Sequence, residues 1–223
     1  MTTPLTAPRA ALWDMDGTLL DSAEYHWLAW RDTLDTEGHP VTHEYFKATF
    51  GQRNDTILRG LLGESTTDTE IARVGGRKEA QYRNLVRERG VELLPGVRTW
   101  LERLQATGWR QAVASAAPRA NVDAILAALA IAPFFAAITS AEDVTRGKPD
   151  PQVFLLAAER LGVVPARCVV IEDAPAGVAA AHRAAMRAIG VRSSHGSLPA
   201  DITVDTLDQL PDDAFDRLLA SQP

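Results

Sequence analysis

The 223-residue sequence has little of several features that mark particular classes of protein. It contains a single cysteine, Cys168, so no disulfide framework can form within the chain. Cys168 lies in an apolar run, and we expect a small buried residue there, not a nucleophile or a ligand. An excess of basic residues is also missing. With 23 Lys and Arg against 29 Asp and Glu, the net charge of -6 argues against a nucleic-acid partner.

Long apolar runs are absent too. The longest, residues 124–137, is interrupted by Pro133 and is shorter than the ~20 residues that a membrane-spanning helix requires. Residues 1–8 contain no apolar stretch of the length found in signal peptides. We therefore expect a cytoplasmic protein that does not bind a membrane. Because nothing in the sequence demands a dimer, we expect a monomer.

The composition that remains, with 46% hydrophobic and 23% charged residues, is that of an ordinary globular protein. Short apolar runs predict strands at residues 10–13, 110–115, 135–139, 167–171, 188–191 and 201–204. Helical patterns separate most of these runs, at residues 97–106, 119–129, 151–161, 176–186 and 212–220. Repeated strand–helix units are typical of an α/β fold, here a Rossmann-like parallel sheet with helices on both faces.

Residues 21–91 depart from this alternation, because they carry helical patterns and no strong strand signal. The first helix starts at a cap, Asp21 or Ser22, and ends at Gly38. Further helices are predicted at residues 42–49, 54–62 and 68–89. We therefore expect a core domain of residues 1–20 and 92–223, and an inserted α-helical cap domain of residues 21–91. Such an insert would form a mobile cap over a site at the strand end; the alternative is that its helices simply pack on the edge of the sheet.

Two carboxylates, Asp14 and Asp16, follow the first predicted strand. In extended backbone, side chains two residues apart point to the same side, so both carboxylates face one site. Gly17 permits the sharp exit that the chain needs at this point. Ligands of open α/β sheets bind at the carboxyl ends of the strands. This stretch is therefore predicted to be an active site.

Polar residues also stand at three other strand ends or helix starts: Ser115, Lys148 and the pair Glu172-Asp173. In a parallel sheet they converge with the first motif on one edge. Carboxylates ~4 Å apart at an effective dielectric of ~20 repel each other by about 4 kcal/mol per pair, so the cluster needs a cation. Mg²⁺ suits it, since this ion takes oxygen ligands and keeps several waters. Together with a lysine and a hydroxyl, it fits the oxygens of a transferring phosphoryl group.

Each signal has a plainer interpretation when it stands alone. An EF-hand calcium loop is excluded, because the glycine falls at loop position four and not six. The metal-binding D-x-D of a glycosyltransferase stays open for the first motif in isolation. Ser115 could cap a helix, Lys148 could be a solvated loop residue, and Glu172 could cap the helix that follows it. Their joint occurrence at strand ends favours one common site.

With its four motifs in this order, the sequence resembles the haloacid dehalogenase superfamily, in the branch of small phosphatases and β-phosphoglucomutase-like proteins. The resemblance covers nearly the whole chain, the helical insert included. It implies that Asp14 is a nucleophile that forms an aspartyl-phosphate. It also implies that Asp16 is the general acid for the leaving oxygen and then the base for water. The dehalogenase branch lacks the second aspartate and the metal cluster.

The same resemblance implies a set of ligands. Mg²⁺ would be held by Asp14, the backbone carbonyl of Asp16, and Asp173, with Glu172 as a further ligand or as a neighbour of the ligands. The phosphoryl group and the substrate next to it would be bound by core residues: Ser115, Lys148, Gly17, Thr18 and Ala116.

Four residues of the helical insert are candidates for substrate contact. His26 faces the catalytic loop if the first helix starts at Ser22. Arg53 and Asn54 follow a glycine-led turn into a helix, where an anion can bind, and resemble a substrate-specificity loop. Lys78 matches a cap lysine that reaches the site in relatives. The plainer alternative for each is a structural or solvated side chain.

The predicted substrate is a small phosphorylated metabolite, and the favoured reaction is its hydrolysis. The alternative is a β-phosphoglucomutase-type mutase, which must hold a second phosphate far from Asp14. In β-phosphoglucomutases a Ser-Lys-Asn run after the second motif helps with this, whereas this chain has Ala117-Pro118-Arg119, in which only the arginine could bind an anion. A non-catalytic binding protein is the remote third possibility, since every catalytic position is filled.

Overall fold

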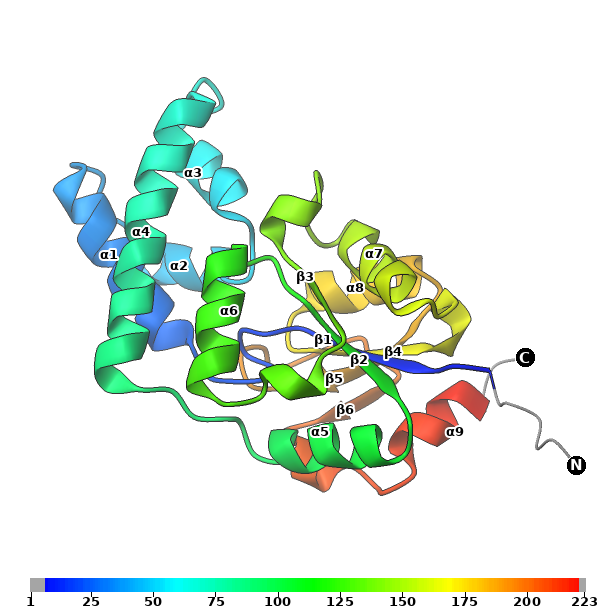
Figure 1. The fold of residues 1–223 in the computed structure, drawn as a ribbon. Helices are drawn as coiled ribbons and strands as arrows, with labels where there is room; N and C mark the ends of the chain where they lie inside the picture. Colours follow the sequence, from blue (N-terminus) through cyan, green and yellow to red (C-terminus); the bar gives the residue numbers. More distant parts are fainter. Residues whose placement is uncertain (1–6, 221–223) are drawn as a thin grey trace, which may run out of the picture.

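A computed structural model of the chain describes residues 7–220. Residues 1–6 and 221–223 lie outside the described part, and with them most of the N-terminal stretch discussed above (Figure 1). Within the described part, six strands form one sheet in the order β3-β2-β1-β4-β5-β6. Every neighbouring pair is parallel, so the predicted fold class is confirmed. The strands are β1 Ala10–Trp13, β2 Arg110–Ala114, β3 Ala137–Thr139, β4 Cys168–Glu172, β5 Arg187–Val191 and β6 Ile202–Val204.

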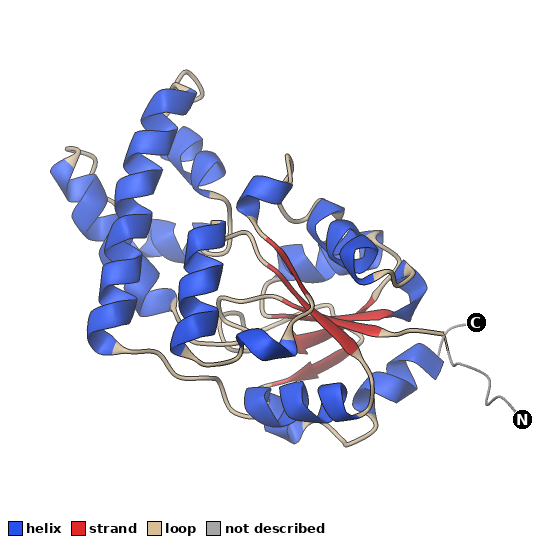
Figure 2. Cartoon of the chain, in the orientation of Figure 1, coloured by secondary structure: helices blue, strands red, loops and turns tan. Residues whose placement is uncertain are grey.

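Strand β1 is buried on both faces because it lies inside the sheet, between β2 and β4. Its side chains alternate between two hydrophobic clusters: Ala11 and Trp13 belong to one, Ala10 and Leu12 to the other. Helices α5, α6 and α9 contribute to the first cluster, together with residues of the inserted helices such as Tyr82, and α7 and α8 contribute to the second. The helices lie on both faces of the sheet (Figure 2). Their bounds are α5 Val97–Ala106, α6 Arg119–Ala128, α7 Gln152–Leu161, α8 Pro175–Arg183 and α9 Ala214–Ala220.

Four helices lie between β1 and α5 and form a separate group beside the sheet (Figure 1). They are α1 Ala23–Thr36, α2 His43–Thr49, α3 Asn54–Leu62 and α4 Asp68–Arg89. This group has a hydrophobic cluster of its own, which includes Trp30, Phe46 and Ile57. It is the inserted helical cap that the fold class included. No helix in the described residues is long and apolar enough to cross a membrane.

Short 3-10 helices occupy several connections for which only loops or strand residues were expected. They are η1 Ala132–Phe134, η2 Ala141–Asp143, η3 Pro165–Arg167 and η4 Leu207–Gln209. The first has Pro133 near its start, where the missing N–H costs no hydrogen bond. Because η1 ends at Phe134, strand β3 begins at Ala137 and not at the predicted residue 135.

Candidate active site

The backbone turns sharply directly after β1. The turn leaves Asp14 at the end of the sheet and directs Asp16 toward the helical group. The amide of Asp14 still donates to Ile171 O at 3.0 Å, so Asp14 remains attached to the sheet. Gly17 has φ +81°, and a Cβ there would lie 2.1 Å from Asp173 Oδ2. Glycine is therefore required both by the left-handed backbone and by the approach of that carboxylate.

Lys148 lies between two carboxylates of the core. Its Nζ donates to Asp14 Oδ1 and, at 2.6 Å, to Glu172 Oε1, and its side chain is only 7% exposed. Burial alone would lower the pKa of Lys148, but the charges of Asp14 and Glu172 outweigh it and raise this pKa above its usual value. Lys148 is therefore a fixed positive charge at the strand ends.

A cluster of three buried carboxylates lies beside that lysine. Asp14, Glu172 and Asp173 each offer an oxygen, and these oxygens lie within 4.8 Å of one another. Burial raises the pKa of Asp14 to about 7 against the pull of Lys148; burial and the charges of Glu172 and Asp14 raise the pKa of Asp173 well above its usual value. These shifts mark carboxylates that are buried and crowded by like charge, so the cluster carries more negative than positive groups. Three oxygen donors with such an excess fit a hard divalent cation such as Mg²⁺.

Glu172 also contacts the start of α8. Its Oε2 accepts the amide of Ala174 at 2.8 Å, while Oε1 accepts Lys148. A Cβ on Gly177 would lie 1.8 Å from the Glu172 carboxylate, so this glycine makes room for it. Glu172 therefore fills both expected roles at once: it contacts the start of a helix and belongs to the acidic cluster.

Ser115 follows β2 and is 1% exposed. Its amide donates to Thr139 O at 3.0 Å, and its Oγ accepts the amide of Ala117 at 3.0 Å. Since the hydroxyl accepts in this turn, its hydrogen remains available to a ligand in the pocket that Ser115 lines.

Asp16 points toward the helical group. Its Oδ1 accepts Ser22 Oγ and lies 3.2 Å from His26 Nε2. His26 Nδ1 lies 2.7 Å from Lys78 Nζ. A lysine ammonium only donates, so Nδ1 accepts and Nε2 carries the hydrogen that is directed at Asp16. Burial alone would raise the pKa of Asp16. His26, Ser22 and Lys78 outweigh burial and lower this pKa below its usual value.

Asp21 or Ser22 was expected to cap α1, and the side chain of Ser22 binds Asp16 instead. Ser22 holds the N-cap position of α1 without a side-chain capping hydrogen bond. The neighbouring Asp21 carboxylate accepts the amide of Ala23 at 3.2 Å. The segment between β1 and α1 is therefore tied both to the carboxylate and to the first helix turn.

Glu79 is a buried carboxylate that the sequence patterns did not single out. Its Oε1 accepts Lys78 Nζ at 2.8 Å and Asn54 Nδ2 at 2.7 Å, and its Oε2 accepts Asn121 Nδ2 from α6. Arg83 donates to Asn121 Oδ1 at 2.8 Å. Burial alone would raise the pKa of Glu79, but the charge of Lys78 outweighs burial and lowers this pKa. The group joins α3 and α4 to a helix that packs on the sheet.

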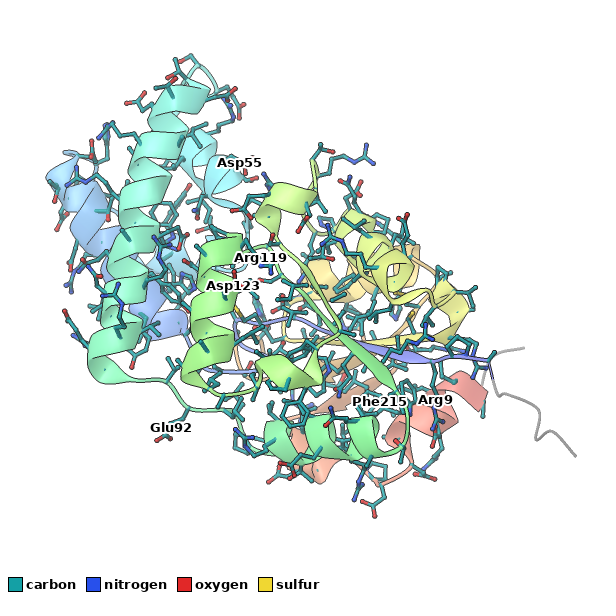
Figure 3. All side chains as sticks on the ribbon, in the orientation of Figure 1. Arg9, Asp55, Glu92, Arg119, Asp123 and Phe215 are labelled. Atoms are coloured by element: carbon teal, nitrogen blue, oxygen red, sulfur yellow. The ribbon has the colours of Figure 1, made fainter. Side chains whose placement is uncertain are left out.

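Arg53 is turned away from the main pocket. Its Nη1 donates to the carbonyls of Ala141 and Val144 at 2.7 and 3.0 Å, and its Nε donates to Asp55 at 3.1 Å. Asp55 lies at the start of α3, beside the connection that follows β3 (Figure 3). This guanidinium ties the helical group to the core, because the two carbonyls follow β3.

Most of the predicted residues surround one cavity of about 260 Å³. It is lined by ten of them: Asp14, Asp16, His26, Asn54, Lys78, Ser115, Ala116, Lys148, Glu172 and Asp173. Gly17, Thr18 and Arg53 are not part of its lining. Thr18 is fully buried, and its hydroxyl has no hydrogen-bond partner.

The same cavity has an apolar wall that the motifs did not reveal. It is formed by four side chains of the helical group: Trp30, Phe46, Phe50 and Ile57. The packing of the helices over the strand ends, and no motif in the sequence, directs these side chains at the site. His195 also lines the cavity, from the loop after β5, with Nδ1 3.2 Å from Asp173 O.

Comparison with known proteins gives a consistent result. Residues 8–185 match the family model described as haloacid dehalogenase-like hydrolase. The chain is 36% identical over 202 residues to a β-phosphoglucomutase of Bacillus subtilis, covering 88% of each protein. It is 34% identical over 184 residues to the fructose-1-phosphate phosphatase YqaB of Escherichia coli, covering 81% of this chain and 95% of that one.

Its fold is similar to that of CbbY from Rhodobacter sphaeroides, solved in complex with xylulose-1,5-bisphosphate. The TM-score is 0.81 at 27% identity, over 91% of this chain and 96% of that one. The family model, the relatives and the fold agree with the four motifs at the strand ends. The chain belongs to the haloacid dehalogenase-like hydrolases.

Proposed function

We propose that this protein is a Mg²⁺-dependent phosphatase that hydrolyses a small sugar phosphate through an aspartyl-phosphate on Asp14. The observation that carries the proposal is the contrast between two carboxylates from one strand end. Asp14 lies with Lys148 and the acidic cluster, whereas Asp16 lies with His26 and the helical group. One carboxylate is thus suited to attack phosphorus and the other to handle a proton.

In the first step an oxygen of Asp14 forms a bond to phosphorus, and the bond from phosphorus to the ester oxygen breaks. Ser115 and Lys148 bind the phosphoryl oxygens, since both donors line the cavity next to Asp14. Asp14, Asp173 and the backbone carbonyl of Asp16, with Glu172 as ligand or neighbour, would hold Mg²⁺. When bound, this ion supplies positive charge against the phosphoryl oxygens.

Asp16 moves the protons of both steps. In the free protein its lowered pKa keeps it ionised, and the negative phosphoryl group raises that pKa when it binds nearby. Asp16 then takes up a proton from the solvent and gives it to the leaving oxygen. In the second step it takes a proton from the water that attacks the aspartyl-phosphate, which releases phosphate and restores Asp14.

The proposal is tested by phosphate release from a panel of sugar phosphates and p-nitrophenyl phosphate in the presence of MgCl₂. Asp14→Asn should abolish turnover, because an amide is a poor nucleophile, and should leave the circular dichroism spectrum unchanged. Near-normal turnover by this variant would remove Asp14 from its role. Failure of the wild-type protein to release phosphate from any ester would overturn the phosphatase assignment.

A mutase is the second candidate, and the similarity to a β-phosphoglucomutase favours it. Against it, Arg119 is exposed and its Nε donates to Asp123 at 2.9 Å on the outside of α6 (Figure 3). β-Glucose 1-phosphate with a bisphosphate activator decides between them. A phosphatase releases inorganic phosphate and forms little glucose 6-phosphate, whereas a mutase does the reverse.

Three further predictions belong to this proposal. Residues 21–91 form the cap domain, and residues 1–20 and 92–223 the core. Ala116, His26, Asn54 and Lys78 line the cavity and are proposed to contact the substrate, whereas Gly17, Thr18 and Arg53 lie outside its lining and shape it through the surrounding backbone and core contacts. A monomer in the cytoplasm, without a nucleic-acid partner, stays the prediction for the working state, and light scattering after size-exclusion chromatography tests its mass.

A further inference from the structure

The cavity has two chemically different halves. The carboxylates, Lys148 and Ser115 line the half at the strand ends. The other half is lined by the helical group, through its aromatic residues, the amide side chains of Gln52 and Asn54, and the pair Lys78 and Glu79. A substrate whose phosphoryl group lies at Asp14 places the rest of its structure in this second half.

The lysine in the second half of the cavity, Lys78, already has partners within the protein. Lys78 is 2% exposed; its Nζ contacts Glu79 Oε1 at 2.8 Å and His26 Nδ1 at 2.7 Å. Glu79 therefore cancels the charge of Lys78 within the lining. The amide of Asn54 is engaged by the same carboxylate.

The arginines nearby are directed elsewhere. Arg53 donates to two backbone carbonyls and to Asp55, Arg83 to Asn121, and Arg119 to Asp123. None of the three is part of the cavity lining. In total the described lining carries five carboxylates, those of Asp14, Asp16, Glu79, Glu172 and Asp173, but only two lysines. A divalent cation and one phosphoryl dianion offset each other, so the lining stays negative.

The remaining surface favours an uncharged body. Trp30, Phe46 and Ile57 present apolar surface that is almost fully covered by the protein. Gln52 is exposed at the rim, where its amide is available to a hydroxyl group. The volume of about 260 Å³ lies just below the range of ligand pockets, which measure roughly 300–1,000 Å³.

We infer that the substrate carries a single phosphate on a small, uncharged, hydroxyl-bearing body, and that Glu79 is the residue that excludes a second phosphate. The inference rests on the proposed phosphatase activity. It separates this chain from the CbbY protein whose structure holds a bisphosphate. A second phosphate would have to leave water for a region with no uncommitted cation, next to like charge.

The test compares fructose 1-phosphate with fructose 1,6-bisphosphate, and glucose 1-phosphate with glucose 1,6-bisphosphate. Each pair differs by one phosphate at the far end. We expect kcat/KM, and inhibition of p-nitrophenyl phosphate hydrolysis, to favour the monophosphate by at least about 10-fold, because like charge and an unpaired anion oppose the bisphosphate. Equal values for the two members of a pair, or a preference for the bisphosphate, would overturn the inference.

Two variants identify the residues responsible. Glu79→Gln keeps a hydrogen-bond acceptor and releases the charge of Lys78, so the preference for the monophosphate should fall by roughly 10-fold, as for a charge pair lost from a site. Gln52→Arg adds a free cation at an exposed position, where folding is not at risk, and should shift the preference in the same direction. Glu88→Gln removes an exposed carboxylate from the same helix as Glu79 and should change nothing. An unchanged preference in both test variants would contradict the role of the charge balance.

A binding measurement separates this inference from the proposed function. If no ester is hydrolysed, the phosphatase assignment fails. Calorimetric titration of the wild-type protein with each member of a pair then still measures the preference. Tighter binding of the monophosphate would support the inference, and tighter or equal binding of the bisphosphate would refute it.

Discussion

The acidic cluster should cost the metal-free protein stability, and Asp173→Asn tests this directly. The variant replaces a carboxylate by an amide of nearly the same shape, so it removes one charge without creating a cavity. Asp173 faces Asp14 and Glu172, with their oxygens within 4.8 Å. At this distance and an effective dielectric of ~20, each repulsion is about 3.5 kcal/mol. The raised pKa of Asp173, which lowers the share of its charged form, and the weaker attraction of Lys148 leave only part of this repulsion acting.

We therefore expect metal-free Asp173→Asn to be more stable than the wild-type protein by about 1–3 kcal/mol. For a chain of this length, about 2–4 °C accompany each kcal/mol, so the melting temperature should rise by roughly 2–12 °C. The assay is thermal unfolding at pH 7.5 in a chelator, followed by circular dichroism. The melts are repeated in MgCl₂ at about 100 times its Kd. Bound Mg²⁺ should then stabilise the wild-type protein by about 2.7 kcal/mol and the variant by much less.

Asp35→Asn is the matched control, since Asp35 is exposed on α1. It should change neither the metal-free stability nor the response to Mg²⁺, because surface substitutions usually stay within about 0.5 kcal/mol. A metal-free Asp173→Asn protein that melts at or below the wild-type temperature would refute the repulsion argument. A full response of that variant to Mg²⁺ would instead remove Asp173 from the ligand set.

Two further predictions concern a proton carrier and the cysteine. Asp16→Ala should lower turnover by roughly 100-fold or more, because proton transfer by a positioned side chain contributes about this much, while calorimetry still detects binding of beryllium trifluoride or phosphate; unchanged turnover would exclude the role. Cys168 is fully buried, and burial raises the pKa of its thiol to about 12. Only about one thiol in ten thousand is then ionised at pH 8, so Ellman's reagent should label the protein only after unfolding in guanidinium. Rapid labelling of the native protein would contradict the burial.

Much of the fold follows from local patterns in the sequence. Helices α3 and α4 have the predicted bounds, because their starts and ends carry strong signals: Thr67 accepts the amide of Glu70, and Gly63 and Gly90 follow the last turns. The start of β3 was predicted two residues early. Apolar residues before it continue the strand pattern, but Pro133 favours a 3-10 turn there. Such local competition is hard to resolve without the tertiary contacts.

The candidate site also contains residues that the sequence predicts and residues that it does not. Asp14, Ser115 and Asp173 lie together because parallel strands end at one edge, which topology alone implies. The direction of Arg53 depends on carbonyls about ninety positions away, and no local pattern contains them. Glu79 resembles a solvated residue in the sequence, since a Lys-Glu pair on a helix usually faces water. The packing of α4 against α3 and α6 buries it, through Asn54 and Asn121.

The position of β1 in the sheet has a consequence for how the protein is made. Ala10 pairs with Arg110 on one side and with Cys168 on the other. At about 5–20 residues per second, the ribosome completes β4 roughly ten to thirty seconds after β1. Until β2 is made, the apolar strand β1 and the nucleophile candidate that follows it have no partner strand, and until β4 is made one edge of β1 stays unpaired. The helical group can meanwhile assemble its own cluster. The first strand to be synthesised therefore waits longest for its second partner, and chaperones have the longest access to the segment that bears Asp14.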